Sequence, residues 1–375
     1  MWASLIPLLA LAGAPIEDTA LEPAFEDCLP RAAASPGVLF VNFDGAVLKE
    51  NCGNDARYNC SSLYDRFDGY VGRFKGTTTQ RAAIIDSVKQ DLRPFDVLVT
   101  TVRPPPDVDY TMVLYGELGP QTFAGLAPYI DCGDRFLNDV AFAQGDESPI
   151  TGATVILHEA GHTWGLEHVD SIFDLMFPVN DSVSASFTDD CQNVVADTEL
   201  TPATGVCTLA HKTYCDLGAQ QSHRELLARF GPSVPDTTPP VIFVDSPPKG
   251  GSIVAGTAAN LVIEIADNRA PQVYDLTLSI DGDQVFQGVV WERFEAPLLV
   301  PTAGSYLLEV EATDPAGNGA TVTHTIHVVY PDTEGFARAR ETTGCRAAAP
   351  TTPGAAIFLS FWLLSFGWGA APRRR

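Results

Sequence analysis

The sequence is short of positive charge. Lys and Arg number 23 among its 375 residues, whereas Asp and Glu number 47, which gives a formal net charge of −24. Such a charge repels phosphate backbones and anionic lipid, so it argues against nucleic-acid binding. Charged residues of both signs make up only 19% of the chain, and hydrophobic residues make up 45%. This balance supports a packed core and excludes wholesale disorder.

Cysteine is also scarce, and no repeat of fixed period is visible. Eight cysteines in 375 residues are too few for a small disulfide scaffold, but they exceed what a cytosolic chain usually carries. The length is sufficient for two or three domains of the usual ~100–200 residues.

Both ends of the sequence have the character of export signals. An apolar run over residues 2–14 ends in Ala-Gly-Ala, which is typical of a signal peptide, placed here within residues 1–20. A buried strand or helix is the alternative, because no Lys or Arg precedes the run. Residues 355–371 form a second apolar, uncharged run, followed by three arginines. At ~1.5 Å per residue this run just crosses a bilayer core, and the basic end would stay in the cytoplasm.

The C-terminal end also has Gly344 and Cys345 before a Pro- and Thr-containing spacer, the apolar run and the basic end. This order resembles the tripartite sorting tails of myxobacterial surface proteins. The resemblance implies a tail over residues 354–375 that engages the membrane and a surface-sorting machinery, and it takes Cys345 out of the disulfide count. A plain C-terminal anchor is the alternative. The expected location is the cell surface, with the protein either anchored by this tail or released.

Composition divides the interior of the chain. The Pro-rich stretch at 233–240 predicts a linker between a domain at 33–232 and a second at 241–330. A second linker is expected at 331–353. In the first domain, strands are expected at 37–43, 96–102, 110–115 and 136–143, with helices at 77–92, from Ala153, and at 219–230. Thr77 and Gln80 have capping-box spacing. This alternation predicts an α+β domain.

The second domain shows a different periodicity. Short runs with period-two alternation predict six strands at 241–244, 261–265, 276–280, 285–290, 306–310 and 321–329. They predict an all-β sandwich, and the turn at 314–318 resembles that of bacterial Ig-like modules. The turn acids Asp267 and Asp314 have the right chemistry for calcium, although solvated turn residues are the simpler interpretation.

The motif that carries chemistry begins at His158. On a helix, His158 and His162 lie on one face, within reach of a single metal ion. If the helix continued, His168 would lie on another face, about 15 Å along the axis. Gly165 removes this difficulty, because glycine tolerates the positive φ that ends a helix and turns the chain back. Three neutral imidazoles would then bind Zn²⁺ with one position left for water.

Glu159 is the candidate general base. It points away from the ligand face and can reach a water whose pKa zinc lowers to about 7. Glu159 would take a proton from this water and return it to the leaving nitrogen of a cleaved peptide bond. The motif's five fixed positions would arise by chance in about one of 10⁵ such chains. The pattern predicts an exported zinc-dependent endopeptidase acting on protein or peptide substrates.

Residues 158–168 match the H-E-x-x-H-x-x-G-x-x-H signature of the metzincin clan of zinc endopeptidases at every fixed position, and the chain resembles that clan here. The resemblance implies a twisted mixed sheet with an edge strand over the cleft, an active-site helix and a C-terminal helix. It also implies a Met-turn at 174–178, in which Met176 would support the histidines. The distance of Met176 from His168 is closest to the matrixin-like branch.

Two departures leave the subfamily open. Val169 replaces the residue that marks the well-known branches after the third histidine. Phe177 and Pro178 provide no tyrosine after the Met-turn, so a tyrosine ligand is not expected.

The remaining cysteines favour disulfides. Cys52 and Cys60 are expected to pair, in preference to a matrixin-like switch at Cys52. Cys207, His211 and Cys215 are each four residues apart, a spacing at which side chains on one face of a helix can bind a metal ion. Nearby Cys191 makes disulfides the better interpretation of this group than a second zinc site.

Two other functions fit the same residues. The first is a surface adhesin in which a metzincin-like domain survives as a non-catalytic binding scaffold. The second is a zinc hydrolase for amide bonds other than peptides.

Overall fold

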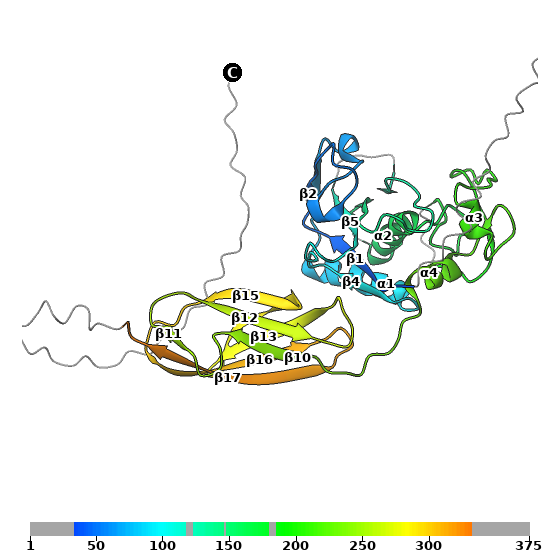
Figure 1. Ribbon diagram of the computed structural model, residues 1–375. Coiled ribbons are helices and arrows are strands. Elements are labelled where there is room, and N and C mark those ends of the chain that lie inside the picture. The colour runs from blue at the N-terminus through cyan, green and yellow to red at the C-terminus, as the bar shows by residue number, and fades with distance from the viewer. Residues whose placement is uncertain (1–33, 118–122, 146–147, 180–184, 332–375) are drawn as a thin grey trace, which may run out of the picture. The chain divides into compact units, whose positions relative to one another are not determined.

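The computed structural model describes residues 34–117, 123–145, 148–179 and 185–331 (Figure 1). The predicted signal peptide at 1–20, nearly all of the linker at 331–353 and the tail at 354–375 lie outside these ranges. Within them, no helix combines the length and apolar character that crossing a membrane requires.

The first domain is built on a mixed sheet. Its strands are β1 (Gly37–Asn42), β2 (Ala46–Val47), β3 (Tyr70–Arg73), β4 (Val97–Thr100), β5 (Thr111–Glu117), β6 (Gly125–Leu126) and β7 (Val140–Gln144). Strands β4, β1, β5 and β7 are parallel neighbours in that order. Strand β6 adds to β7 in the antiparallel sense, as β3 does to β5. Strands β1, β5 and β7 are buried along almost their whole length, as the interior of a sheet covered on both faces requires, whereas the edge strand β4 is only partly buried.

The α-helices are α1 (Thr78–Leu92), α2 (Pro149–Thr163), α3 (Thr208–His211) and α4 (Ser222–Phe230). There are also two 3₁₀ turns, η1 (Ala56–Tyr58) and η2 (Tyr64–Arg66). Two short strands, β8 (Gln192–Asn193) and β9 (Ala219–Gln220), form a separate antiparallel pair.

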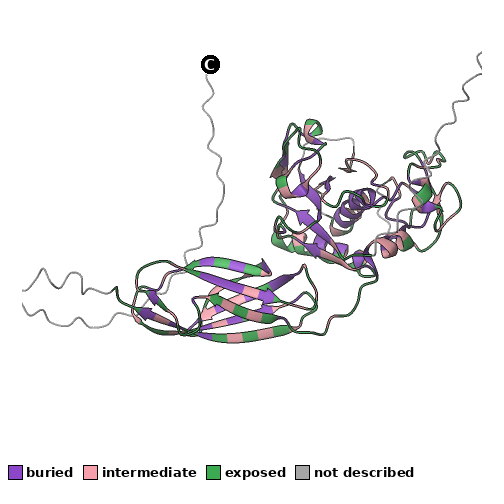
Figure 2. Ribbon diagram, viewed as in Figure 1, coloured by how far each residue is buried: buried purple, intermediate pink, exposed green. Residues whose placement is uncertain are grey.

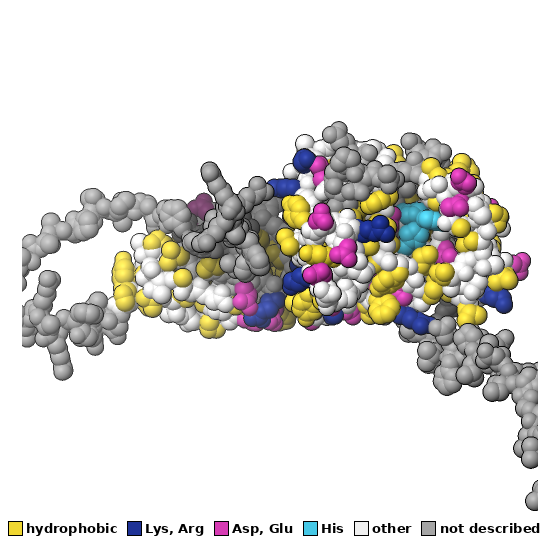
Figure 3. All heavy atoms as spheres, turned by 90° about the horizontal axis from the view of Figure 1, so that it is seen from above, with side chains coloured by type: hydrophobic (Ala, Val, Ile, Leu, Met, Phe, Trp, Pro, Cys, Tyr) yellow, Lys and Arg dark blue, Asp and Glu magenta, His cyan; other side chains and the backbone are white. Residues whose placement is uncertain are grey.

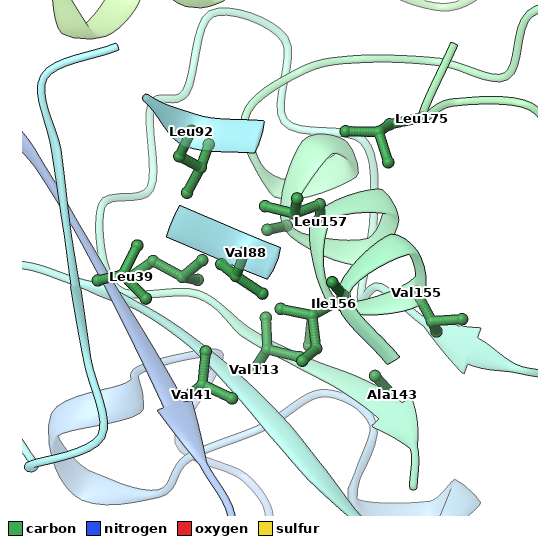
Figure 4. Close-up of a cluster of buried hydrophobic side chains, with 14 of the residues drawn as sticks. Leu39, Val41, Val88, Leu92, Val113, Ala143, Val155, Ile156, Leu157 and Leu175 are labelled. Atoms are coloured by element: carbon green, nitrogen blue, oxygen red, sulfur yellow. The ribbon is translucent and has the colours of Figure 1, made fainter. Parts of the chain in front are cut away.

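Three of the α-helices, α1, α2 and α4, pack on one face of this sheet, and the segments around the 3₁₀ turns pack on the other. Val88 of α1 and Ile156 of α2 meet Val113 of β5 in one buried cluster (Figure 4). Because α2 packs on the sheet along its length, its histidine-bearing end is held at a fixed position.

Several boundaries differ from those expected. The α1 capping box of Thr77 and Gln80 is confirmed. Helix α2 begins at Pro149 rather than Ala153, because the Ser148 side chain caps it and proline fits the first turn. Strand β7 begins at Val140 rather than at 136, since the Asp131 carboxylate accepts the N–H of Phe136.

The last helix is shorter than expected. Helix α4 starts at Ser222 rather than at 219, because Ala219 and Gln220 pair with β8 instead.

The second domain is a two-sheet all-β sandwich, as predicted. Its strands are β10 (Val241–Ser246), β11 (Ser252–Val254), β12 (Ala259–Ala266), β13 (Val273–Ile280), β14 (Asp283–Trp291), β15 (Arg293–Leu298), β16 (Gly304–Thr313) and β17 (Gly319–Val329). One sheet has the order β10-β12-β15 and the other β11-β17-β16-β13-β14. Buried and exposed residues alternate along several strands, most regularly in β15 (Figure 2).

Two of these strands were missed from the sequence. Strand β11 is only three residues long. Strand β15 alternates regularly, but its outward Glu295 and Pro297 and its inward Ala296 have weak strand preference.

The first domain buries an acid that lacks full hydrogen bonding. Asp139 is 0% exposed. Its Oδ1 accepts the hydroxyl of Tyr129 at 2.6 Å and the amide of Asn54. Its Oδ2 has no partner among the described residues. Burial raises the pKa of Asp139 from 3.8 to about 7. The unfolded chain therefore loses this proton first, and stability falls as the pH rises between these two values.

We predict that Asp139→Asn raises the free energy of unfolding at pH 8 by roughly 2–4 kcal/mol, at about 1.4 kcal/mol per unit of pKa. At pH 4 the effect should nearly vanish, because the native carboxyl is then neutral. Urea unfolding at both pH values measures the difference, with exposed Asp107→Asn as the matched control. Equal stability of Asp139→Asn and the unmodified chain at pH 8 would contradict the prediction.

Candidate metal centre

The structure brings the three predicted metal ligands together. Helix α2 presents His158 and His162 with their Nε2 atoms 3.2 Å apart. The helix ends at Thr163, and Gly165 at φ +96° turns the chain back. The Nε2 atom of His168 then lies 3.1 Å from that of His158 and 3.2 Å from that of His162. Gly165 therefore has the backbone conformation expected of it.

The tautomers of two histidines leave lone pairs at the centre. Nδ1 of His158 donates to the Leu175 carbonyl, and Nδ1 of His162 donates to the Leu166 carbonyl, both at 2.8 Å. A neutral ring with its proton on Nδ1 has a lone pair on Nε2. Burial lowers the pKa of His158 to about 4 and lowers that of His162 well below its ordinary value. Both rings are therefore neutral at physiological pH.

This arrangement fits a tetrahedral cation. Lone pairs that face one another at about 3 Å repel, and a positive charge between them would replace this repulsion with attraction. Zinc binds imidazole nitrogens at ~2.0–2.1 Å, and tetrahedral geometry then places the nitrogens about 3.3 Å apart. The three Nε2 distances of 3.1–3.2 Å are close to this requirement.

The predicted Met-turn lies beneath the histidine helix. Met176 is fully buried, and a methyl group on Gly161 would lie 2.5 Å from its Sδ atom. Asp174 holds the turn, because its carboxylate accepts the N–H of Met176 at 2.9 Å and the hydroxyl of Thr188 at 2.6 Å. The hydroxyl of Ser222 donates to it at 3.2 Å. Met176 thus lies against the helix that carries His158 and His162, and its role as their support stays a prediction. The contacts of Asp174 were not identified from the sequence.

The candidate base lies beside the ligands and below β6. Glu159 is 6% exposed. Its carboxylate occupies the space that a side chain at Gly125 would need. Burial raises the pKa of Glu159 to about 8, while the backbone N–H of Ala127 opposes this shift. A divalent cation nearby would lower this pKa and favour the carboxylate.

The site is open to solvent on one side. His158 and His168 are partly exposed, whereas His162 is buried. Figure 3 shows histidine side chains visible from outside, with hydrophobic side chains near them. The exposure of His158 and His168 makes two of the three imidazoles accessible to solvent.

Three disulfides are present among the described residues. The predicted pair Cys52–Cys60 is confirmed. Cys207 pairs with Cys132, and Cys215 with Cys191. The preference for disulfides over a second zinc site at Cys207, His211 and Cys215 is therefore confirmed, because neither sulfur is a free thiolate.

The imidazole of that group has another role. Burial lowers the pKa of His211, but hydrogen bonds with Glu167 and Glu225 outweigh it and raise the pKa to about 9. His211 is thus an imidazolium between two carboxylates.

The sandwich domain has a separate acidic group. Carboxylate oxygens of Asp267, Asp314 and Asp236 lie within 4.8 Å of one another. Asp236, in the linker, was not identified from the sequence. Asp314 is also bonded to the amide groups of Asn318. Solvated turn acids stay the favoured interpretation of this group, with calcium binding as the alternative.

No protein-family model and no curated protein matches the chain. Among solved structures, the fibronectin(III)-like modules of Clostridium thermocellum CbhA share 13% identity at a TM-score of 0.21, covering 30% of this chain and 54% of theirs. The PKD domain of an M14-like peptidase from a Thermoplasmatales archaeon shares 12% at 0.20, covering 25% and 98%. OgpA from Akkermansia muciniphila shares 10% at 0.19, covering 80% and 95%. The chain thus spans about half of the CbhA structure, and all three superpositions are loose.

The site geometry predicts that metal binding needs each imidazole. His162→Ala should abolish stoichiometric zinc binding, because two imidazoles would remain where the geometry provides three. His327→Ala, in the sandwich domain, is the matched control and should retain one zinc per chain. Elemental analysis after dialysis measures both, and zinc retained at one equivalent by His162→Ala would contradict the assignment.

Proposed function

We propose that this protein is an exported zinc endopeptidase of the metzincin clan. The observation that carries the proposal is the convergence of the His158, His162 and His168 Nε2 atoms within 3.1–3.2 Å, with buried Glu159 beside them. A buried acid next to an open, three-imidazole site is the combination that metal-assisted hydrolysis requires.

In the proposed hydrolysis, one side chain would transfer protons and the others would hold the reacting groups in place. A bound zinc ion would supply Lewis acidity to the scissile carbonyl and acidify the attacking water. Glu159 would take a proton from that water and transfer it to the amide nitrogen as the peptide bond breaks. The Ala127 N–H would hold the Glu159 carboxylate in place between these two transfers. His158 and His162 would keep their orientation through the Leu175 and Leu166 carbonyls.

The position of β6 supports a peptide substrate. Among the described residues, β6 pairs only with β7, and Gly125 of β6 lies against Glu159. An extended peptide can add to such a free strand edge through main-chain hydrogen bonds. A peptide bound there would run past the candidate base. This geometry favours a peptide over other amide substrates.

The sandwich and the chain ends give the proposal its cellular setting. The sandwich would serve as an Ig-like accessory module for display or substrate docking. The three disulfides agree with an oxidising compartment. The signal peptide and the tail would place the enzyme at the cell surface.

We predict that Glu159→Gln lowers kcat for casein cleavage by about 10²–10⁴, the usual contribution of a general base. The variant should keep its zinc and its unfolding temperature, because the amide preserves the shape of the side chain. Exposed Glu199→Gln is the matched control and should cleave normally. Undiminished cleavage by Glu159→Gln would discard the mechanism. Zinc binding without any cleavage by the unmodified chain would favour the non-catalytic scaffold.

A further inference from the structure

A buried carboxylate stands next to the third ligand in the chain. Glu167 directly precedes His168 and is 6% exposed. Its Oε1 atom accepts the backbone N–H groups of Val206 at 2.6 Å and Cys207 at 2.7 Å. Nε2 of His211 lies 3.3 Å from the same oxygen. A buried charge needs such donors, so Glu167 is fastened to a segment about 40 residues away along the chain.

The main chain at this position is fixed as well. The N–H of Glu167 donates to Oε1 of Gln220 at 2.7 Å, and Nε2 of Gln220 donates back to the Glu167 carbonyl at 3.1 Å. The next carbonyl, that of His168, accepts the N–H of Val195 at 2.9 Å. The backbone that carries the third ligand therefore has little freedom to shift.

His211 links this anchor to α4. Its Nδ1 lies 2.9 Å from both carboxylate oxygens of Glu225, and only 2% of its surface is exposed. One imidazole thus joins two carboxylates in a dry environment. The charge of Glu167 is compensated within the protein, so this group has no need of a metal ion.

The disulfide Cys132–Cys207 fastens the same region covalently. Cys207 supplies one of the N–H groups that bind Glu167. On the other side, the neighbour of Cys132 is Asp131, whose N–H donates to the His162 carbonyl at 3.0 Å. The bond joins positions 75 residues apart. The disulfide therefore connects the loop at Asp131, which contacts the ligand His162, to the loop at Cys207, which contacts Glu167, the residue before the ligand His168.

We propose that Glu167 is a positioning residue for His168, and that closing the Cys132–Cys207 disulfide is what gives the site its tight affinity for zinc. This inference rests on the proposed zinc-dependent function. Reduction by two equivalents of a thiol would open the bond to two cysteine thiols and yield one external disulfide. The loops at Cys132 and Cys207 would then separate more easily, and the N–H groups of Val206 and Cys207 would hold Glu167, and with it His168, less firmly. Metal loading would thus be completed only in an oxidising compartment.

The test compares double variants of the full chain. Cys132→Ser with Cys207→Ser should weaken zinc affinity 10–100-fold, the usual cost of losing an outer support of a metal ligand. Cys52→Ser with Cys60→Ser removes a disulfide of the same domain that contacts none of the three ligand histidines in the described part of the chain, and should leave the affinity within twofold. Competition with a colorimetric zinc chelator gives the affinity. The d–d spectrum of the cobalt(II) form reports any change in ligand geometry.

Glu167→Gln provides a second test with every disulfide intact. It should weaken zinc binding in the same direction and alter the cobalt(II) spectrum, whereas exposed Glu199→Gln should do neither. This variant decides the matter if the Cys132 and Cys207 double variant does not fold.

The outcomes separate the two proposals. Unchanged zinc affinity in folded Glu167→Gln and in the folded disulfide variant would overturn the positioning role, while leaving a zinc-binding, hydrolytic wild type intact. Failure of the unmodified chain to bind zinc would overturn the proposed function together with this inference.

Discussion

The convergence of three imidazole nitrogens is the constraint that the surrounding parts of the first domain must satisfy. Nitrogen lone pairs at 3.1–3.2 Å repel one another, so the protein must hold them there by other contacts. Helix packing on the sheet fixes His158 and His162, and a positive-φ glycine returns the chain to His168. A tetrahedral cation would turn this repulsion into attraction. The proposed metal site would account for the close approach of the three rings.

Buried carboxylates stabilise the surroundings of this centre in a common way. Glu159, Glu167 and Asp174 each accept at least one backbone N–H, which offsets the cost of burying a negative charge. The Glu159 carboxylate is held by a group beside the edge strand. The carboxylates of Glu167 and Asp174 tie the ligand loop and the Met-turn to later segments of the chain. One set of interactions thus compensates charge and orders the loops that have little regular structure.

The sequence alone determined the parts of the site that depend on local spacing. His158 and His162 are one helical turn apart, so their common face follows from helix geometry. Gly165 signals the turn that brings back His168, because few other residues accept its φ. The alternation of the sandwich strands likewise follows from a period of two. These features involve residues close together in the chain, and their physical cause is visible in a short window.

Only the tertiary structure decided which contacts form between segments that are far apart in the chain. Nothing local to Cys132 indicates that its partner is Cys207, and the pairing depends on where two irregular loops meet. The anchoring of Glu167 by His211 depends on the same meeting of loops. The start of β7 shifted because Asp131 captures a backbone N–H that a strand would have used. Such choices are set by competition among contacts across the fold, for which sequence periodicity carries no signal.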